Sequence, residues 1–119
     1  MLFFWLGRRC VRRVILAAVL LLGAAAWFGW PSRAAAPAGV TISGFAFAPA
    51  TLTVPRGTTV TWTNEDDEPH TVASADDPRR FKSGALDTGD RFSFTFDTPG
   101  TYKYFCTIHP HMQGVVVVR

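Results

Sequence analysis

The sequence predicts an all-β domain, a sandwich or a barrel, that follows a short hydrophobic leader. From Val40 onward, short runs rich in β-branched and aromatic residues alternate with turn signals that contain Pro and Gly. After residue 39, no stretch has the apolar period of an amphipathic helix. The chain of 119 residues is long enough for one small domain.

The first half of the domain contains three expected strands. Two of them are Val40–Phe47 and Thr51–Val54. The third, Thr58–Thr63, alternates, with Val60 and Trp62 on one face and threonines on the other. A period of two residues is typical of a strand that is buried on one side only.

The second half contains three more expected strands. Arg91–Phe96 repeats the alternation, with its three phenylalanines facing inward and Ser and Thr facing outward. Thr101–Cys106 follows a Pro-Gly turn, and Val115–Val118 closes the chain as an apolar strand that we expect to be buried. The polar stretches Asn64–Pro69 and Ala75–Gly84 are the expected loops.

The first 38 residues have the composition of an export signal. Four arginines precede the apolar run Val14–Trp30, and small residues follow it, so that cleavage after Ala38 would leave alanine at both specificity positions. The pair Arg12-Arg13 before apolar residues resembles a twin-arginine export signal. These features predict a periplasmic or otherwise exported protein.

The alternative for this leader is an uncleaved membrane anchor with a hydrophobic helix. Its apolar run is slightly shorter than the ~20 residues that a spanning helix needs. In either case we expect two parts, with residues 1–38 as an export signal peptide or membrane anchor plus a short linker and residues 39–119 as the functional domain. The protein would touch a membrane only if the leader is retained.

The charge of the domain gives no support for nucleic acid as a partner. Residues from Gly39 onward carry seven basic and nine acidic side chains, a net charge of −2, whereas the whole chain carries +3 because arginines crowd the leader. The basic balance of the chain therefore gives no argument for binding nucleic acid.

Four side chains of the domain form a candidate metal-ligand set. Cys106 is the only cysteine after the leader, and His109 and Met112 follow it at steps of three residues in a short loop between two expected strands. Taken singly, these residues could be a buried inert thiol, a surface histidine and a core methionine. With His70 as a second imidazole, they match the ligand types of a mononuclear blue-copper site.

His111 competes with His70 for the place of the second imidazole. It lies two residues beyond His109 in the same loop and is flanked by Pro110 and Met112. From that position it would have difficulty reaching the same metal, so we interpret His111 as solvent-facing and favour His70.

At this point the residues resemble a known family. The segment from Gly39 to Arg119 is similar to the cupredoxins, and most to amicyanin and its plastocyanin and pseudoazurin relatives. The resemblance implies a Greek-key β-sandwich with one copper ion at one end, held by His70, Cys106, His109 and Met112. The matching segments are Val60–Asn64, Glu68–Val72, Pro99–Tyr102 and Tyr104–Val117.

Two positions depart from amicyanin. Thr71 replaces an asparagine next to the first histidine ligand, which leaves open whether a side chain supports the ligand loop there. Its backbone N–H can still donate to the cysteine sulfur, as the family does. His111 replaces an apolar residue, which makes the surface near the copper end more polar.

The resemblance implies a one-electron shuttle, with the outer edge of His109 as the electron port and a monomeric protein that meets its redox partners transiently. The partner would be a redox protein such as a c-type cytochrome or a periplasmic dehydrogenase. The acidic run Glu65–Glu68 is either a solvated turn or a docking patch for a basic partner.

Rival functions fit the residues less well. A copper enzyme needs additional histidine-rich sites, and the chain has three histidines. A dinuclear electron-transfer centre needs two bridging cysteines, and the domain after the leader has one. A copper carrier or storage protein is the alternative that we keep, although such proteins often use methionine-rich tracts.

Overall fold

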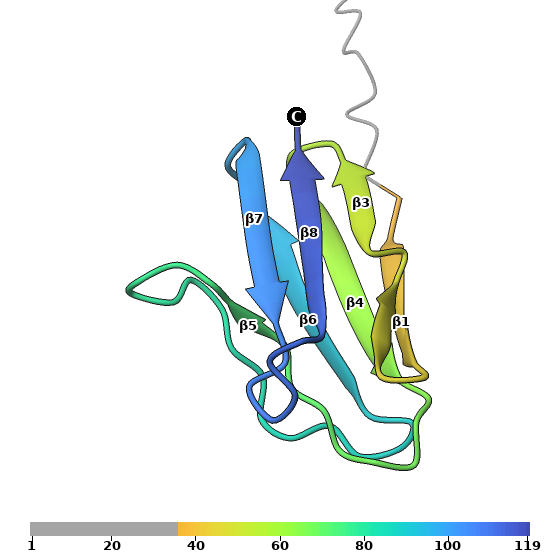
Figure 1. Cartoon of the computed structure of the whole chain (residues 1–119). Coiled ribbons are helices and arrows are strands. Elements are labelled where there is room, and N and C mark those ends of the chain that lie inside the picture. The colour runs from red at the N-terminus through yellow and green to blue at the C-terminus, as the bar shows by residue number, and fades with distance from the viewer. Residues whose placement is uncertain (1–35) are drawn as a thin grey trace, which may run out of the picture. The chain divides into compact units, whose positions relative to one another are not determined.

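The computed structural model describes residues 36–119, and every regular element in that range is a β-strand (Figure 1). The all-β class predicted from the sequence is confirmed, whereas the predicted leader helix lies outside the described residues. The strands are β1 Ala38–Ser43, β2 Ala46–Ala48, β3 Thr51–Val54, β4 Thr58–Asn64, β5 Ala73–Ser74, β6 Arg91–Phe96, β7 Gly100–Phe105 and β8 Gln113–Val118.

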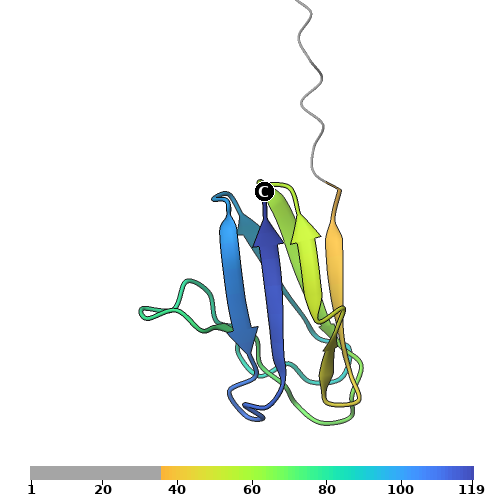
Figure 2. The ribbon, with the colours of Figure 1, turned by 45° about the horizontal axis from the view of Figure 1, so that its top comes forward.

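The strands form two four-stranded sheets that pack as a sandwich (Figures 1 and 2). One sheet has the order β2-β1-β4-β6 and the other β3-β8-β7-β5. Most neighbours are antiparallel, but β1 runs parallel to β4 and β3 runs parallel to β8. Within residues 36–119, no helix is long and apolar enough to span a membrane.

The first predicted strand is wrong in one respect. Val40–Phe47 is not one strand but parts of β1 and β2, which pair as a hairpin with Ser43 opposite Ala46. The turn residues Gly44 and Phe45 both have positive φ, 60° and 58°. Tight hairpin turns need this conformation at both central positions, and Phe rarely adopts it.

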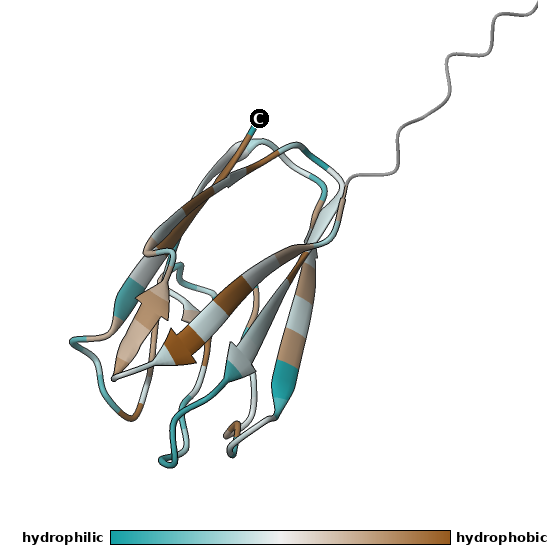
Figure 3. Cartoon of the chain, turned by 90° about the vertical axis from the view of Figure 1, so that its right-hand side faces the viewer, coloured by the Kyte–Doolittle hydropathy of each residue, from teal (hydrophilic) through white to brown (hydrophobic). Residues whose placement is uncertain are grey.

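The core lies between the two sheets. Val60 and Trp62 are fully buried, as their alternation predicts, and hydrophobic positions recur along the strands between more polar ones (Figure 3). On β6 the inward prediction holds fully for Phe96, which is 1% exposed, whereas Phe92 and Phe94 are half-buried at the margin of the core.

Gly114 serves packing inside a strand. A Cβ atom at this position would collide with the ring of Tyr104, which lies directly opposite on β7. The Tyr104 ring also packs edge-to-face on Trp62, with ring centroids 5.4 Å apart, and burial raises the pKa of Tyr104 to about 12. Gly114 therefore makes room for an aromatic contact between the two sheets.

Several loops meet at one end of the sandwich. The β4–β5 segment, the β7–β8 loop, the β1–β2 turn and the part of the β5–β6 segment that leads into β6 lie at the end opposite the C-terminus (Figures 1 and 2). This arrangement brings the predicted ligands from the β4–β5 segment and from the β7–β8 loop to the same place.

Candidate metal centre

Three of the four predicted ligands meet at the loop end of the sandwich. The Nδ1 atoms of His70 and His109 lie 3.2 Å apart, and each lies 3.9 Å from the Sγ atom of Cys106. The three donor atoms fall within 4.8 Å of one another. One ion with bonds of about 2.0–2.3 Å to nitrogen and sulfur can contact all three.

Backbone hydrogen bonds hold the two buried ligands. The N–H of His70 donates to the carbonyl of Leu86 at 3.1 Å, and the N–H of Leu86 donates back to His70 at 2.7 Å. Cys106 directly follows β7, and its N–H donates to the carbonyl of Met112 at 3.1 Å. Both ligands are 0% exposed, so their side chains have little freedom to move away from the site.

The β7–β8 loop is closed on itself. The N–H of Met112 donates to the carbonyl of His109 at 2.9 Å, which folds the loop into a tight turn. The side chain of Met112 is 2% exposed, whereas His109 is half-buried. The buried thioether follows the two ligands of this loop, and its role as the axial ligand stays a prediction.

His111 does not join the cluster. It is exposed, and its ring centroid lies 6.2 Å from that of His109. The prediction that His111 faces solvent is therefore confirmed, and the second imidazole that lies beside Cys106 is that of His70.

The hydrogen bonds of His70 define its tautomer. Its Nε2 atom lies 2.8 Å from Oδ2 of Asp66, and an ionised carboxylate can only accept a hydrogen bond. Nε2 must then carry the proton, which leaves the lone pair of the neutral ring on Nδ1, facing His109 and Cys106. A neutral imidazole in this tautomer is prepared to bind a metal ion.

Thr71 supports the cysteine with two groups. Its N–H donates to Sγ of Cys106 at 3.3 Å, and its hydroxyl oxygen accepts from the N–H of Thr107 at 2.7 Å. The two threonine hydroxyls also form a hydrogen bond of 2.8 Å with each other. The question that the replacement of asparagine raised is thereby answered, because the threonine side chain ties the β4–β5 segment to the ligand loop.

The environment of Cys106 favours the thiolate. Burial alone would raise its pKa, but hydrogen bonds from the backbone N–H groups of Thr71 and His109 outweigh burial and lower the pKa to about 6. The thiolate is the form that binds metal.

The acidic run is not uniform. Asp66 points inward, with its side chain 12% exposed, and accepts from the backbone N–H groups of Gly44 at 2.6 Å and Phe45 at 2.9 Å. The bond from Phe45 is the main reason why the pKa of Asp66 lies below its usual value. Neither alternative proposed for the run as a whole describes Asp66, and only Glu65, Asp67 and Glu68 are exposed.

Sequence reasoning missed three residues around the site. Asp66 lies four residues before His70, and this short separation was the available sequence signal that the carboxylate could reach the imidazole. Asn64 is fully buried, and its amide donates to the carbonyls of Glu68 and Leu86, both at 2.8 Å. The ring of Phe45 forms T-shaped contacts with those of His70 and His109, with centroid distances of 5.2 and 5.0 Å, although nothing in the local sequence relates it to either histidine.

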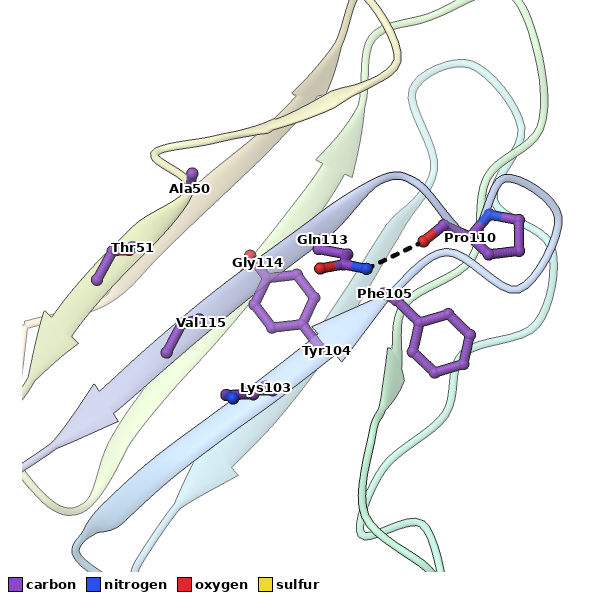
Figure 4. Close-up of a pocket in the computed structure, with 9 residues that line it drawn as sticks. All are labelled: Ala50, Thr51, Lys103, Tyr104, Phe105, Pro110, Gln113, Gly114 and Val115. Carbon is purple, nitrogen blue, oxygen red and sulfur yellow. Dashed lines mark hydrogen bonds between the residues drawn. The ribbon is translucent and has the colours of Figure 1, made fainter.

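A surface pocket of about 490 Å³ lies beside the centre but does not contain it (Figure 4). Its walls come from β7 and β8, from Ala50 and Thr51, and from Pro110 of the ligand loop. None of the four predicted ligands lines it, so this pocket is not the candidate metal centre.

Comparison with known proteins settles the family. The family model of the cupredoxin-like domain matches residues 15–118 of the chain. The chain belongs to the cupredoxin-like family. The family resemblance inferred from the sequence is thus confirmed.

Individual relatives agree with this assignment. Amicyanin-alpha of Methylorubrum extorquens is 38% identical over 90 residues, which cover 71% of this chain and 76% of the relative. A plastocyanin of Scenedesmus fuscus is 36% identical over 84 residues, which cover 61% of this chain and 86% of the relative.

Solved structures share the same fold. A purple cupredoxin from Nitrosopumilus maritimus superposes with a TM-score of 0.64 at 39% identity, over 69% of this chain and 99% of that one. A copper-containing nitrite reductase from Thermus scotoductus superposes with a TM-score of 0.65 at 35% identity, over 70% of this chain but only 22% of the reductase. The cupredoxin fold therefore occurs both as a complete small protein and as part of a larger enzyme.

The donor set of this chain fits the copper cofactor predicted from the sequence. Two imidazole nitrogens and one thiolate-prone sulfur converge, and a buried thioether follows in the same loop. Hard cations prefer oxygen donors, and this cluster offers nitrogen and sulfur only.

Proposed function

We propose that this protein is a small blue-copper electron carrier whose copper site is formed by His70, Cys106, His109 and Met112. The observation that carries the proposal is the convergence of two imidazole Nδ1 atoms on one cysteine sulfur at 3.9 Å each. Bound copper supplies a one-electron Cu(I)/Cu(II) couple. The chain supplies a ligand set that suits both oxidation states.

Rigidity is the chain's contribution to fast electron transfer. His70 and Cys106 are fully buried and are held by backbone bonds on either side, and Thr71 ties their two segments together. A site that changes little in geometry between oxidation states loses little energy to rearrangement. Met112 would tune the reduction potential as a weak axial ligand.

His109 is the proposed port through which the electron enters and leaves. It is the one half-buried ligand of the cluster, whereas the other two are fully buried. The large hydrophobic side chains exposed beside it are Phe45 and Ile108, at 39% and 47%, and Pro110 is exposed as well. An apolar rim of this size suits a small, transient redox contact.

The partner is a redox protein, either a c-type cytochrome or a periplasmic dehydrogenase. The exposed acids Glu65, Asp67 and Glu68 precede His70 in the chain and favour a partner with a basic surface. The leader, residues 1–38, directs the domain of residues 39–119 out of the cytoplasm, and the domain acts as a monomer.

Two other functions are weighed against this one. A copper carrier must release its metal, whereas here two of the ligands are fully buried and braced. A copper reductase or oxidase needs an additional copper site, and among the described residues the His70–Cys106–His109 cluster is the only group of three or more metal-ligating side chains.

The test is reconstitution of the exported domain with copper, followed by absorption spectroscopy and voltammetry. An intense thiolate-to-copper band and a reversible one-electron wave are expected, together with rapid oxidation of the reduced protein by a c-type cytochrome. A colourless protein that binds Cu(I) and passes it to an apo-acceptor would identify the carrier instead.

A further inference from the structure

Asp66 joins the metal centre to the β1–β2 turn. Its Oδ2 atom lies 2.8 Å from Nε2 of His70 and also accepts the N–H of Phe45 at 2.9 Å, while its Oδ1 atom accepts the N–H of Gly44 at 2.6 Å. The carboxylate thus connects a ligand histidine with a turn that lies 21 and 22 residues upstream of it in the chain.

The position of this carboxylate is determined from several sides. The N–H of Asp66 donates to the side-chain oxygen of Asn64 at 3.0 Å, and its carbonyl accepts the hydroxyl of Thr88 at 2.7 Å. Asn64 is itself fully buried. Hydrogen bonds with several other protein groups therefore orient Asp66.

The hydrogen bond to His70 has a chemical consequence at the opposite side of the ring. A carboxylate that accepts from Nε2–H fixes the ring orientation and the tautomer, and it makes the nitrogen on the other side a stronger donor. A negative charge close to the site favours Cu(II) over Cu(I), because the doubly charged ion is attracted to it more strongly.

The same carboxylate also positions a hydrophobic ring. By holding the N–H of Phe45 it stabilises the positive φ of 58° at this residue. The ring of Phe45 then forms T-shaped contacts with both histidines, at 5.2 and 5.0 Å between centroids. Asp66 thereby influences His109 indirectly, as well as His70 directly.

We infer that Asp66 is a positioning residue of the metal centre, which presents Nδ1 of His70 to the metal and lowers the reduction potential of the site. This inference rests on the proposed copper site and adds to it a specific role for one member of the acidic run. The other three acids of that run, which are exposed, do not share the role.

The experiment compares Asp66→Asn with the matched control Asp67→Asn. The two variants each remove one negative charge, and they do so at adjacent residues. Asp67 is exposed, however, whereas Asp66 contacts the ring of His70. We expect Asp66→Asn to lose Cu(II) affinity by about 10-fold or more relative to Cu(I). For one electron a tenfold change corresponds to about 59 mV, so its potential rises by that amount above the control.

A second measurement uses the copper-free protein. The ¹⁵N resonances of His70 should show the Nε2–H tautomer in the wild type and in Asp67→Asn, and a mixture of tautomers in Asp66→Asn. Asp66→Glu keeps a carboxylate and should restore part of the wild-type potential and tautomer. If Asp66→Asn is too unstable to purify, Asp66→Glu is compared with the wild type instead. This variant keeps the net charge and moves the carboxylate, so a role in positioning requires that its reduction potential differ from the wild-type value.

The outcomes separate this inference from the proposed function. Equal potentials, equal copper affinities and equal tautomers in Asp66→Asn and Asp67→Asn would overturn the role of Asp66 while the blue-copper site stands. A wild-type protein without the thiolate-to-copper band would overturn the proposed function, and the tautomer measurement on the copper-free protein would still decide whether Asp66 orients His70.

Discussion

The two segments that supply the histidine ligands differ in how they are held. His70 is fully buried, its backbone is paired with Leu86, and its ring is braced by Asp66. His109 lies in the short loop between β7 and β8 and is half-buried. One histidine is therefore built into the protein body, whereas the other lies where a partner can approach.

Under the proposed function, this difference divides the tasks between the two histidines. A buried and braced imidazole keeps the geometry constant when the oxidation state changes. An imidazole with an accessible edge provides electronic coupling to the outside. Cys106 lies between the two segments and is linked to the first by Thr71 and to the second by the chain itself.

The largest effect is expected at Cys106, which contacts both histidine-bearing segments. Cys106→Ala removes the only thiolate of the cluster, so the visible band and the redox wave should disappear completely, while the β-sandwich stays folded. Absorption spectra measure the loss of the visible band, and circular dichroism spectra measure whether the β-sandwich stays folded. A variant that kept the intense band would contradict the assignment of Cys106.

The next prediction tests the difference between the two histidines directly. His109→Gly opens a half-buried position, so added imidazole should enter and restore most of the band. His70→Gly leaves a cavity that the protein covers, and imidazole should restore little of it. His111→Ala is the control and should keep the wild-type spectrum. Equal rescue of both glycine variants would mean that His70 and His109 are equally accessible.

A smaller effect is expected for the predicted axial ligand. Met112→Gln replaces a thioether by an oxygen donor, which favours Cu(II) over Cu(I). Copper and colour should be retained, and the reduction potential should fall by about 59 mV for each tenfold gain in the preference for Cu(II). An unchanged potential in voltammetry would mean that Met112 is only a buried core residue.

The smallest effect is expected at the exposed acids before His70. Neutralising Glu65, Asp67 and Glu68 together, with Asp66 kept, should slow electron transfer to a basic cytochrome by about 10-fold or less at low salt. The salt dependence of the rate should become flatter, since charges are screened over ~8–10 Å at ordinary ionic strength. Stopped-flow rates that match the wild type at every salt concentration would make this run a solvated turn.

Local patterns were sufficient to predict most strands of the sandwich, but not the short strand β5. The alternation in Thr58–Thr63 and Arg91–Phe96 and the turn signals between runs report burial on one face, and β4 and β6 lie where they indicated. The hairpin between β1 and β2 could not be found in this way. The positive φ of Phe45 goes against its local preference and is stabilised by Asp66, which lies 21 residues away.

The sequence by itself determined the donor types, because a thiolate, an imidazole and a thioether at steps of three residues, with a further histidine upstream, already indicate a soft metal-ligand set. Only the tertiary structure decided how they are used. It brought His70 to within 3.9 Å of a sulfur 36 positions away, turned Asp66 inward out of an acidic run, and left His109 half-buried beside Phe45. The physical reason is that ligand identity is a property of single side chains, whereas orientation, burial and hydrogen bonding depend on contacts between segments that the local sequence does not relate.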